Sequence, residues 1–253
     1  MKRKKILGQA VSMKLTGLIL TYNCENLVQK AIDNIPKDIL YEIICIDDDS
    51  KDNTREIVEK NKISFFTHEH AGYGGNLFEG LKIAFKRGAT HVVEIHGDGQ
   101  YDLSKIVDVN AMLKNDNKID LILGNRFYDY KKPLQNKMGI VKYFGNIGVT
   151  LVASMGLGIK SRDLFPGFRV YSQNFFEKLN FEKLSKFYWF SFEIIALSVF
   201  NNLKINEIAV DCDYKSEHNS MSMWKGIPFV WHTLKTVVQF RLAKLNIKSG
   251  IFK

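Results

Sequence analysis

The chain has 253 residues, of which 45% are hydrophobic and 25% are charged. This is the composition of an ordinary globular protein, long enough for one large α/β domain with or without an appendage. Three cysteines, an odd number without C-x-x-C spacing, favour a reducing cytoplasm and argue against a structural zinc site. The formal net charge of +9 implies an anionic partner, such as nucleic acid, a lipid headgroup layer or a phosphorylated small molecule.

The sequence predicts neither a secretion signal nor a membrane-spanning helix. The basic residues 1–5 are followed by Gln9, Ser12 and Lys14 before any adequate apolar core develops. The longest uncharged run, residues 143–159, is shorter than the ~20 apolar residues that a span requires. We therefore expect a protein of the cytoplasm.

Strand and helix signals alternate over the first half of the chain. Apolar and β-branched runs predict strands, and apolar residues at helical spacing predict the helices between them. This alternation predicts a mainly parallel sheet with right-handed crossovers and helices on both faces. The expected strands are residues 15–22, 41–46, 63–67, 91–95 and 120–124, and the expected helices are 25–34, 54–60, 75–87 and 103–113.

Past residue 130 the alternation stops. Residues 140–159 are apolar and rich in small residues, 165–170 read as a loop, and 187–200 read as an aromatic-rich helix. We divide the chain into a basic extension (1–14), an α/β domain (15–215) and a helical extension (216–253).

A last helix is expected over residues 228–245. It carries an apolar stripe with basic flanks, which suits packing on the core or on a partner subunit, the interpretation we favour, and also suits an anionic membrane surface. Homo-oligomerisation therefore stays open. The stripe consists of Trp231, Leu234, Val238, Leu242 and Leu245, with Lys235, Arg241 and Lys244 beside it.

The carboxyl ends of the expected parallel strands gather polar segments at one edge of the sheet, which is where ligands bind in open α/β sheets. The most informative segment is 95–102, where Asp98 and Gln100 stand two residues apart between glycines. Their oxygens suit a hard divalent cation that bridges the phosphates of a substrate. A βα turn with the aspartate as a helix cap explains the same pattern equally well.

Two further segments of this edge have both a functional and a structural interpretation. Asp48, in the acidic run 47–49, is placed to accept hydrogen bonds from a base or a ribose, although a turn with a helix cap also suits this run. The glycine-rich run 72–76 fails the dinucleotide fingerprint because Leu77 stands where a glycine is required. It allows a close pass by a phosphate or simply forms a helix entry.

Basic residues suggest a second anion site without identifying it. Arg126, Lys142 and Arg169 lie in apolar or glycine-flanked settings, where a phosphate contact and a salt bridge to the acidic rim are both reasonable. Other basic residues are spread through the chain, and no nucleic-acid signature is present, so no nucleic-acid partner is expected. His68 and His70 lack a third ligand at zinc-like spacing and read as ordinary residues.

Taken together, six motifs resemble the ordered signature of family 2 glycosyltransferases, and among these they are most similar to the dolichol-phosphate-mannose synthase branch. Six blocks in order are far more specific than any one of them. They are Thr21-Tyr22-Asn23, Asp47-Asp48-Asp49-Ser50, Gly72-Tyr73-Gly74-Gly75-Asn76, Gly97-Asp98-Gly99-Gln100, Gly124-Asn125-Arg126-Phe127 and Gly167-Phe168-Arg169.

The resemblance implies a GT-A fold and an inverting enzyme that uses Mg²⁺ or Mn²⁺ and a GDP- or UDP-linked sugar. The acceptor it implies is a polyprenyl phosphate or a cell-surface saccharide. The implied site comprises donor contacts (Thr21, Tyr22, Asn23, Glu25, Asp48, Gly75, Gly97, Asp98), metal ligands (Asp98, Gln100, His96), acceptor contacts (Arg126, Lys142, Arg169, Glu193) and catalytic residues (Asp98, Arg126, Arg169).

Some assignments depend on the acceptor. A saccharide hydroxyl needs a general base, for which Asp163 is a candidate from position alone, whereas a lipid phosphate needs none. His96 stands where the branch has an aspartate, so a non-catalytic nucleotide-sugar or polyanion binder with a degenerate metal site is the alternative function. For a lipid acceptor the enzyme would be peripheral on the inner face of the membrane.

Overall fold

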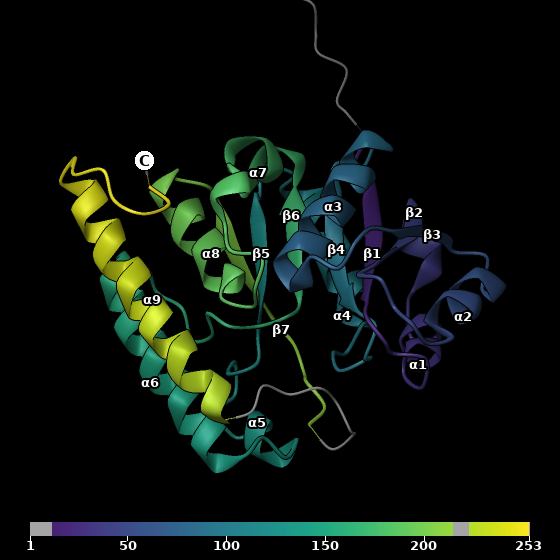
Figure 1. Cartoon of the computed structure of the whole chain (residues 1–253), viewed down its shortest axis with the longest axis horizontal. Coiled ribbons are helices and arrows are strands. Elements are labelled where there is room, and N and C mark those ends of the chain that lie inside the picture. Colours follow the sequence, from purple (N-terminus) through teal and green to yellow (C-terminus); the bar gives the residue numbers. More distant parts are fainter. Residues whose placement is uncertain (1–11, 215–222, 253) are drawn as a thin grey trace, which may run out of the picture.

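The computed structural model describes residues 12–214 and 223–252, which form an α/β fold around one seven-stranded sheet (Figure 1). The strand order is β3-β2-β1-β4-β6-β5-β7. All pairings are parallel except those of β6, which runs antiparallel to β4 and β5. The expected mainly parallel sheet is thereby confirmed. The strands are β1 (Leu15–Thr21), β2 (Glu42–Asp47), β3 (Ser64–Thr67), β4 (His91–His96), β5 (Leu121–Asn125), β6 (Arg169–Ser172) and β7 (Ile205–Ala209).

Helices cover both faces of the sheet because successive residues of each strand point to opposite sides. Leu18 and Leu20 of β1 belong to one buried cluster, and Ile19 belongs to another on the opposite face. The first cluster includes α3 (Gly72–Lys86), α7 (Gln173–Lys178) and α8 (Phe190–Phe200), and the second includes α1 (Val28–Asp33), α2 (Thr54–Lys60) and α4 (Lys105–Asn115).

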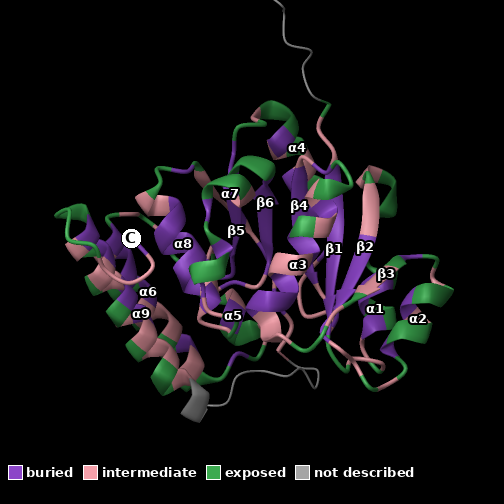
Figure 2. Cartoon of the chain, turned by 45° about the horizontal axis from the view of Figure 1, so that its top comes forward, coloured by how far each residue is buried: buried purple, intermediate pink, exposed green. Residues whose placement is uncertain are grey.

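A further layer lies outside α8. After the short α5 (Lys132–Gln135), the helices α6 (Ile140–Leu157) and α9 (Met223–Lys244) pack side by side at one end of the molecule (Figure 2). Arg241 Nη2 donates a hydrogen bond of 2.8 Å to the carbonyl of Met155. Only part of this pair turns toward the core, where Phe240 and Ala243 are buried.

The structure corrects several expectations from the sequence. Residues 165–170 are not all loop, because β6 begins at Arg169. Strand β7 was not expected, since its residues are mostly half-buried and give no clear strand pattern. Helix α3 begins three residues before the expected position, at Gly72. Helix α9 continues past Pro228 toward its amino end.

The stripe of the last helix does not pack on the core as one of our two expectations had it, whereas packing on a partner subunit stays a prediction. Trp231, Val238 and Leu245 are exposed, and the buried positions include Thr233 and Thr236. By length and composition alone, α6 would suffice to cross a membrane, and 22% of its residues are buried. The expected extension at residues 1–14 lies outside the described residues except for 12–14.

Candidate active site

The carboxyl ends of β1, β2 and β4 are in register, so the segments that follow them lie at one edge of the sheet. Thr21 pairs with Asp47, and Leu20 pairs with His96. Beyond the strands, the Asp48 amide donates to the Thr21 carbonyl, and the Gly97 amide donates to the Leu20 carbonyl. Asp48 and the expected metal motif after β4 therefore flank the same strand.

The loops after β1 and β2 are fastened to each other by side chains that we expected at the donor site. Buried Thr21 donates to Asp47 Oδ1 at 2.7 Å, and the Asn23 carboxamide oxygen accepts from the Lys51 amide. The Glu25 carboxylate accepts from the backbone and side chain of Asn53. In this structure Thr21, Asn23 and Glu25 position the loops.

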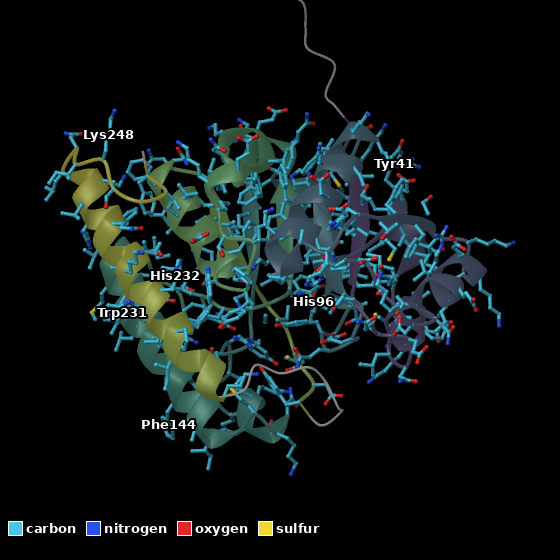
Figure 3. All side chains as sticks on the ribbon, viewed as in Figure 1. Tyr41, His96, Phe144, Trp231, His232 and Lys248 are labelled. Carbon is cyan, nitrogen blue, oxygen red and sulfur yellow. The ribbon has the colours of Figure 1, made fainter. Side chains whose placement is uncertain are left out.

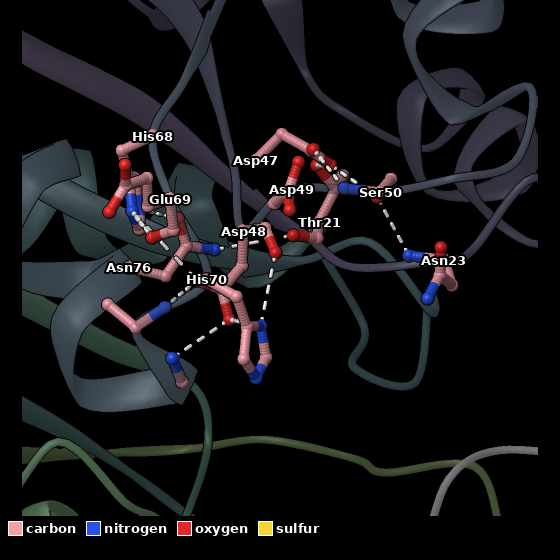
Figure 4. Close-up of polar contacts among 12 residues, drawn as sticks. Thr21, Asn23, Asp47, Asp48, Asp49, Ser50, His68, Glu69, His70 and Asn76 are labelled. Atoms are coloured by element: carbon pink, nitrogen blue, oxygen red, sulfur yellow. Dashed lines mark hydrogen bonds and ion pairs between the residues drawn. The ribbon is translucent and has the colours of Figure 1, made fainter.

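Asp48 is buried and joins the loop after β2 to the start of α3 (Figure 4). Its two carboxylate oxygens accept hydrogen bonds from the backbone amides of Ala71 and Gly72, at 2.7 and 3.0 Å. His70 Nδ1 lies 2.9 Å from the same carboxylate. The position agrees with a helix cap, and a direct contact between Asp48 and a nucleoside stays a prediction.

An aromatic pair opens to solvent beside Asp48. The rings of Tyr22 and His70 lie 4.8 Å apart with an interplanar angle of 35°, and both residues are exposed. Exposed ring faces of this kind can stack on a nucleobase. No local pattern singles out His70, because its proximity to Tyr22 depends on the pairing of β1 with β2 and of β2 with β3.

The expected metal motif lies in the turn after β4. Asp98 and Gln100 are partly exposed, and the Gln100 amide donates to Asp98 Oδ1 at 3.1 Å. The Gln100 carbonyl accepts from the Asp213 amide, and Tyr101 bridges to Cys212. The segment 211–214, which the sequence did not single out, therefore forms one wall of this turn.

The donor set fits a divalent cation that the substrate helps to bind. Within residues 12–214 and 223–252, no three His, Cys, Asp or Glu side chains converge as a metal cage. Asp98 and Gln100 nevertheless offer a carboxylate and an amide oxygen. Mg²⁺ is commonly held by one or two carboxylates with substrate phosphates and water, so this pair is compatible with a cation that a bound diphosphate also ligates.

His96 faces into the protein instead of joining this pair. Its Nε2 lies 2.9 Å from Glu94 Oε1 and 3.1 Å from the Gly167 carbonyl, so this nitrogen carries a proton. Burial alone would lower the pKa of His96, but the hydrogen bond and charge of Glu94 outweigh burial and raise it. Metals bind neutral imidazole, so this position does not support His96 as a ligand.

Arg169 also lies inside the protein. Its side chain is fully buried on β6, where Nη1 donates to Tyr73 Oη at 3.3 Å, while Nε and Nη2 have no hydrogen-bond acceptor within the described residues. The Glu94 carboxylate nearby supplies the opposite charge. A guanidinium without exposed surface does not reach a phosphate, so the expected acceptor contact is not supported.

Arg126 and Asp163 form a buried ion pair with two parallel hydrogen bonds. Arg126 Nε lies 2.7 Å from Asp163 Oδ2, and Nη2 lies 2.8 Å from Oδ1. The guanidinium also donates to the Phe165 carbonyl and to Tyr214 Oη. Asp163 is fully buried and engaged at both oxygens, so the structure does not support it as a general base.

Lys142 is the cation that remains available beside this ion pair. Its ammonium lies 5.0 Å from the centre of the Tyr214 ring and has no carboxylate partner among the described residues. Burial and the adjacent Arg126 lower the pKa of Lys142. Burial raises the pKa of the Cys212 thiol, and the charges of Arg126 and Lys142 partly oppose this.

The remaining expected residues are structural in this conformation. Glu193 on α8 is buried, with Oε1 lying 2.7 Å from His232 Nε2 on α9 and Oε2 accepting from the Ser185 amide. It therefore fastens α9 to the domain. A Cβ atom on Gly97 would meet Cys24 Sγ and the Leu20 carbonyl at 2.9 Å. Gly75 is likewise buried within α3, so both glycines serve internal packing.

Comparison with known proteins agrees with this architecture. Residues 18–180 match the sequence model of glycosyl transferase family 2. A UDP-N-acetylglucosamine–dolichyl-phosphate N-acetylglucosaminyltransferase from Methanococcus voltae is 29% identical over 233 residues, covering 84% of this chain and 90% of the relative. An uncharacterised protein of Methanocaldococcus jannaschii is 28% identical over 213 residues, covering 83% of this chain and 84% of its own length.

Solved structures with the same fold come from a distant enzyme. Glucosyl-3-phosphoglycerate synthase from Mycobacterium tuberculosis, in complex with UDP, superimposes with a TM-score of 0.68 at 16% identity, covering 94% of this chain and 82% of that chain. A complex of the same enzyme with Mn²⁺, UDP and its product gives a TM-score of 0.67 at 15% identity, covering 90% and 80%. The fold is that of the GT-A glycosyltransferases, and the chain belongs to glycosyl transferase family 2.

Proposed function

We propose that this glycosyltransferase moves a sugar from a UDP-linked donor to a polyprenyl phosphate, with a divalent cation and with inversion at the anomeric carbon. The Methanococcus relative is named for UDP-N-acetylglucosamine and dolichyl phosphate, and the mycobacterial structures contain UDP, which favours UDP over GDP. The reaction would take place on the cytoplasmic side of a membrane, where the enzyme is peripheral.

The observation that carries the choice of acceptor is that, of the two cations in contact with Tyr214, Arg126 is paired with a carboxylate and Lys142 is not, among the described residues. Asp163 is sequestered by Arg126, so it cannot take a proton from a sugar hydroxyl. The neighbouring Lys142 ammonium has no carboxylate partner among the described residues, and such a cation is suited to bind an anionic group. A phosphate acceptor is already anionic and needs no general base.

The residues then have separate tasks in the reaction. The rings of Tyr22 and His70 stack on the base, and Asp98 with Gln100 would hold Mg²⁺ or Mn²⁺, which supplies charge neutralisation at the leaving diphosphate. Lys142 orients the acceptor phosphate. An acceptor oxygen attacks the anomeric carbon from the face opposite the diphosphate, the glycosidic C–O bond breaks, and UDP leaves with the electron pair.

One observation favours a second function. The His96 imidazole is turned to Glu94, so the position that holds an aspartate in the branch that the sequence resembles contributes no carboxylate here. A protein that binds nucleotide-sugars without turning them over would tolerate this loss. Such a binder would respond to UDP-sugars by thermal shift and would release no UDP.

Transfer of radiolabelled sugar to polyprenyl phosphate and to oligosaccharides, each with Mn²⁺ or with EDTA, tests the proposal. We expect transfer to the lipid phosphate only, lost with EDTA, and lower by about a thousandfold or more in Asp98→Ala. Asp108→Ala, which removes an exposed carboxylate from α4, is the matched control. Undiminished turnover in Asp98→Ala would exclude the proposed metal site.

A further inference from the structure

The outer side of α6 and α9 presents large apolar side chains to solvent. Phe144 is 66% exposed and Trp231 is 72% exposed, and in Figure 3 both lie on the outer side of the helix pair, whereas His232 points toward the domain. We call this surface the outer face. It comprises Ile140, Val141, Phe144, Leu151, Val152 and Met155 of α6, Ile227, Trp231 and Val238 of α9, and Leu245 and Ile247 just beyond.

The inner sides of the same helices mix small and hydroxyl residues with a few large apolar ones. Thr150 and Ser154 of α6 and Thr233 and Thr236 of α9 are buried, as are Tyr143, Leu157 and Phe240. Among the described residues the Thr150 hydroxyl has no hydrogen-bond partner. At Gly156 a side chain would collide with Val237, so the two backbones approach closely there. Helices in water bury their apolar side, whereas helices in lipid pack through small and hydroxyl residues. This pair shares with the second pattern its outward-facing large apolar side chains and its close approach at Gly156.

The charges around the outer face have one sign. Residues 130–162 and 223–253 contain no aspartate or glutamate, although they include many lysines and arginines. Lys235, Arg241 and Lys244 are exposed along α9, and Lys248 follows it. Two copies of such a face would repel each other, whereas a surface of anionic headgroups would attract it.

We propose that the outer face docks on an anionic lipid bilayer, with α6 and α9 lying in the plane of the headgroup layer and their apolar side chains reaching the acyl chains. This deepens the proposed function, on which it rests for its biological sense, because a polyprenyl phosphate resides in a bilayer. Lys142, in the first turn of α6, lies beside Arg126, while its neighbour Val141 belongs to the outer face. The acceptor site therefore adjoins the docked surface.

Flotation of the full chain with phosphatidylcholine vesicles, with and without phosphatidylglycerol, tests the docking. We expect binding to the anionic vesicles that weakens with salt. The double variant Phe144→Glu/Trp231→Glu should bind about a hundredfold more weakly, roughly tenfold for each side chain. Lys235→Gln should weaken binding to the anionic vesicles about fivefold. Val107→Glu, at a residue of α4 that is 49% exposed, is the matched control and should float like the unaltered chain.

The same variants separate docking from transfer. UDP-sugar thermal shifts and transfer to a short-chain, water-soluble polyprenyl phosphate should be unchanged in Phe144→Glu/Trp231→Glu. This result verifies that the variant is folded. Vesicle binding without any transfer would overturn the proposed function and leave the docking face standing. Vesicle binding that the double variant does not weaken would overturn the docking proposal. A dimer that the double variant dissociates in light scattering, without vesicle binding, would also overturn it.

Discussion

The sheet edge of this molecule buries charge, whereas the outer pair of helices exposes apolar side chains. At the edge, buried Arg126 is paired with buried Asp163, and half-buried His96 is paired with buried Glu94. On the outer pair, Phe144 and Trp231 are mostly in contact with solvent. Soluble proteins ordinarily show the opposite distribution of charged and large apolar residues.

The buried charges at the sheet edge and the exposed apolar face differ in what compensates them. The two buried carboxylates at the edge, Glu94 and Asp163, are compensated inside the chain, because each has a basic partner and hydrogen bonds. The exposed apolar face has no such compensation within the described residues. We therefore expect the stability of the sheet edge to be sensitive to internal substitutions. We expect the outer face, which needs an outside partner, to be sensitive to its surroundings.

Breaking the ion pair at the sheet edge should have the largest effect. Asp163→Ala leaves the Arg126 guanidinium buried without its counter-ion, so we expect the free energy of unfolding to fall by about 3–5 kcal/mol in urea denaturation. Asp163→Asn keeps hydrogen-bond acceptors and should lose less. It should also retain transfer activity within about tenfold, since a positioning residue is not a general base. An Asp163→Ala variant of normal stability that is inactive would contradict this structural role.

Separating the outer helices should have an intermediate effect. Gly156→Ala places a methyl group against Val237, and we expect a loss of about 1–3 kcal/mol from overpacking. Gly148→Ala is the matched control, because a Cβ atom there meets nothing within 4 Å. It should gain about 0.5–1 kcal/mol from helix propensity. Equal stability of the two variants, measured by thermal unfolding, would show that the close approach of α6 and α9 is unimportant.

The smallest effect is expected at Lys142, where the two regions meet. Lys142→Met should raise the KM for polyprenyl phosphate by about tenfold and leave the KM for the donor unchanged, because one charge-assisted contact is lost. Lys137→Met, at an exposed residue, serves as the control. An unchanged KM in Lys142→Met would assign the acceptor phosphate to another cation.

The lowered pKa of Lys142 also predicts the direction of two further effects, on the stability of Lys142→Met and on the pH dependence of acceptor binding. The pKa of Lys142 is lowered in the folded chain, so its protonated form opposes folding at every pH below its unfolded value of ~10.4. Lys142→Met should therefore not be less stable at neutral pH. In the unaltered enzyme, acceptor binding should weaken as the pH rises through this lowered pKa, earlier than for an ordinary lysine.

The sequence predicted the first half of the fold well because its signals are local. Apolar runs mark β1, β2, β4 and β5, and Asp98 and Gln100 follow directly from the turn after a buried strand. Strand β6 is only four residues long and follows Pro166 and Gly167, so no local pattern marks it. The interior positions of Arg169 and His96 depend on contacts with Tyr73, Glu94 and Gly167, which come from other elements.

The last helix shows a different limit. Its stripe of Trp231, Val238 and Leu245 is real, and the usual rule turns such a stripe toward the core. Here Thr233, Thr236 and Ala243 are buried instead. Periodicity identifies the two sides of a helix, but it does not say which side meets the protein.

The three thiols have a practical consequence for following the molecule on a surface. Burial raises the pKa of Cys24 to about 11 and also raises the pKa of Cys45 and Cys212, so little thiolate exists at neutral pH and alkylation is slow. A cysteine introduced at exposed Leu151 would react much faster than these. A fluorophore attached there would report immersion depth directly, with every native cysteine left in place.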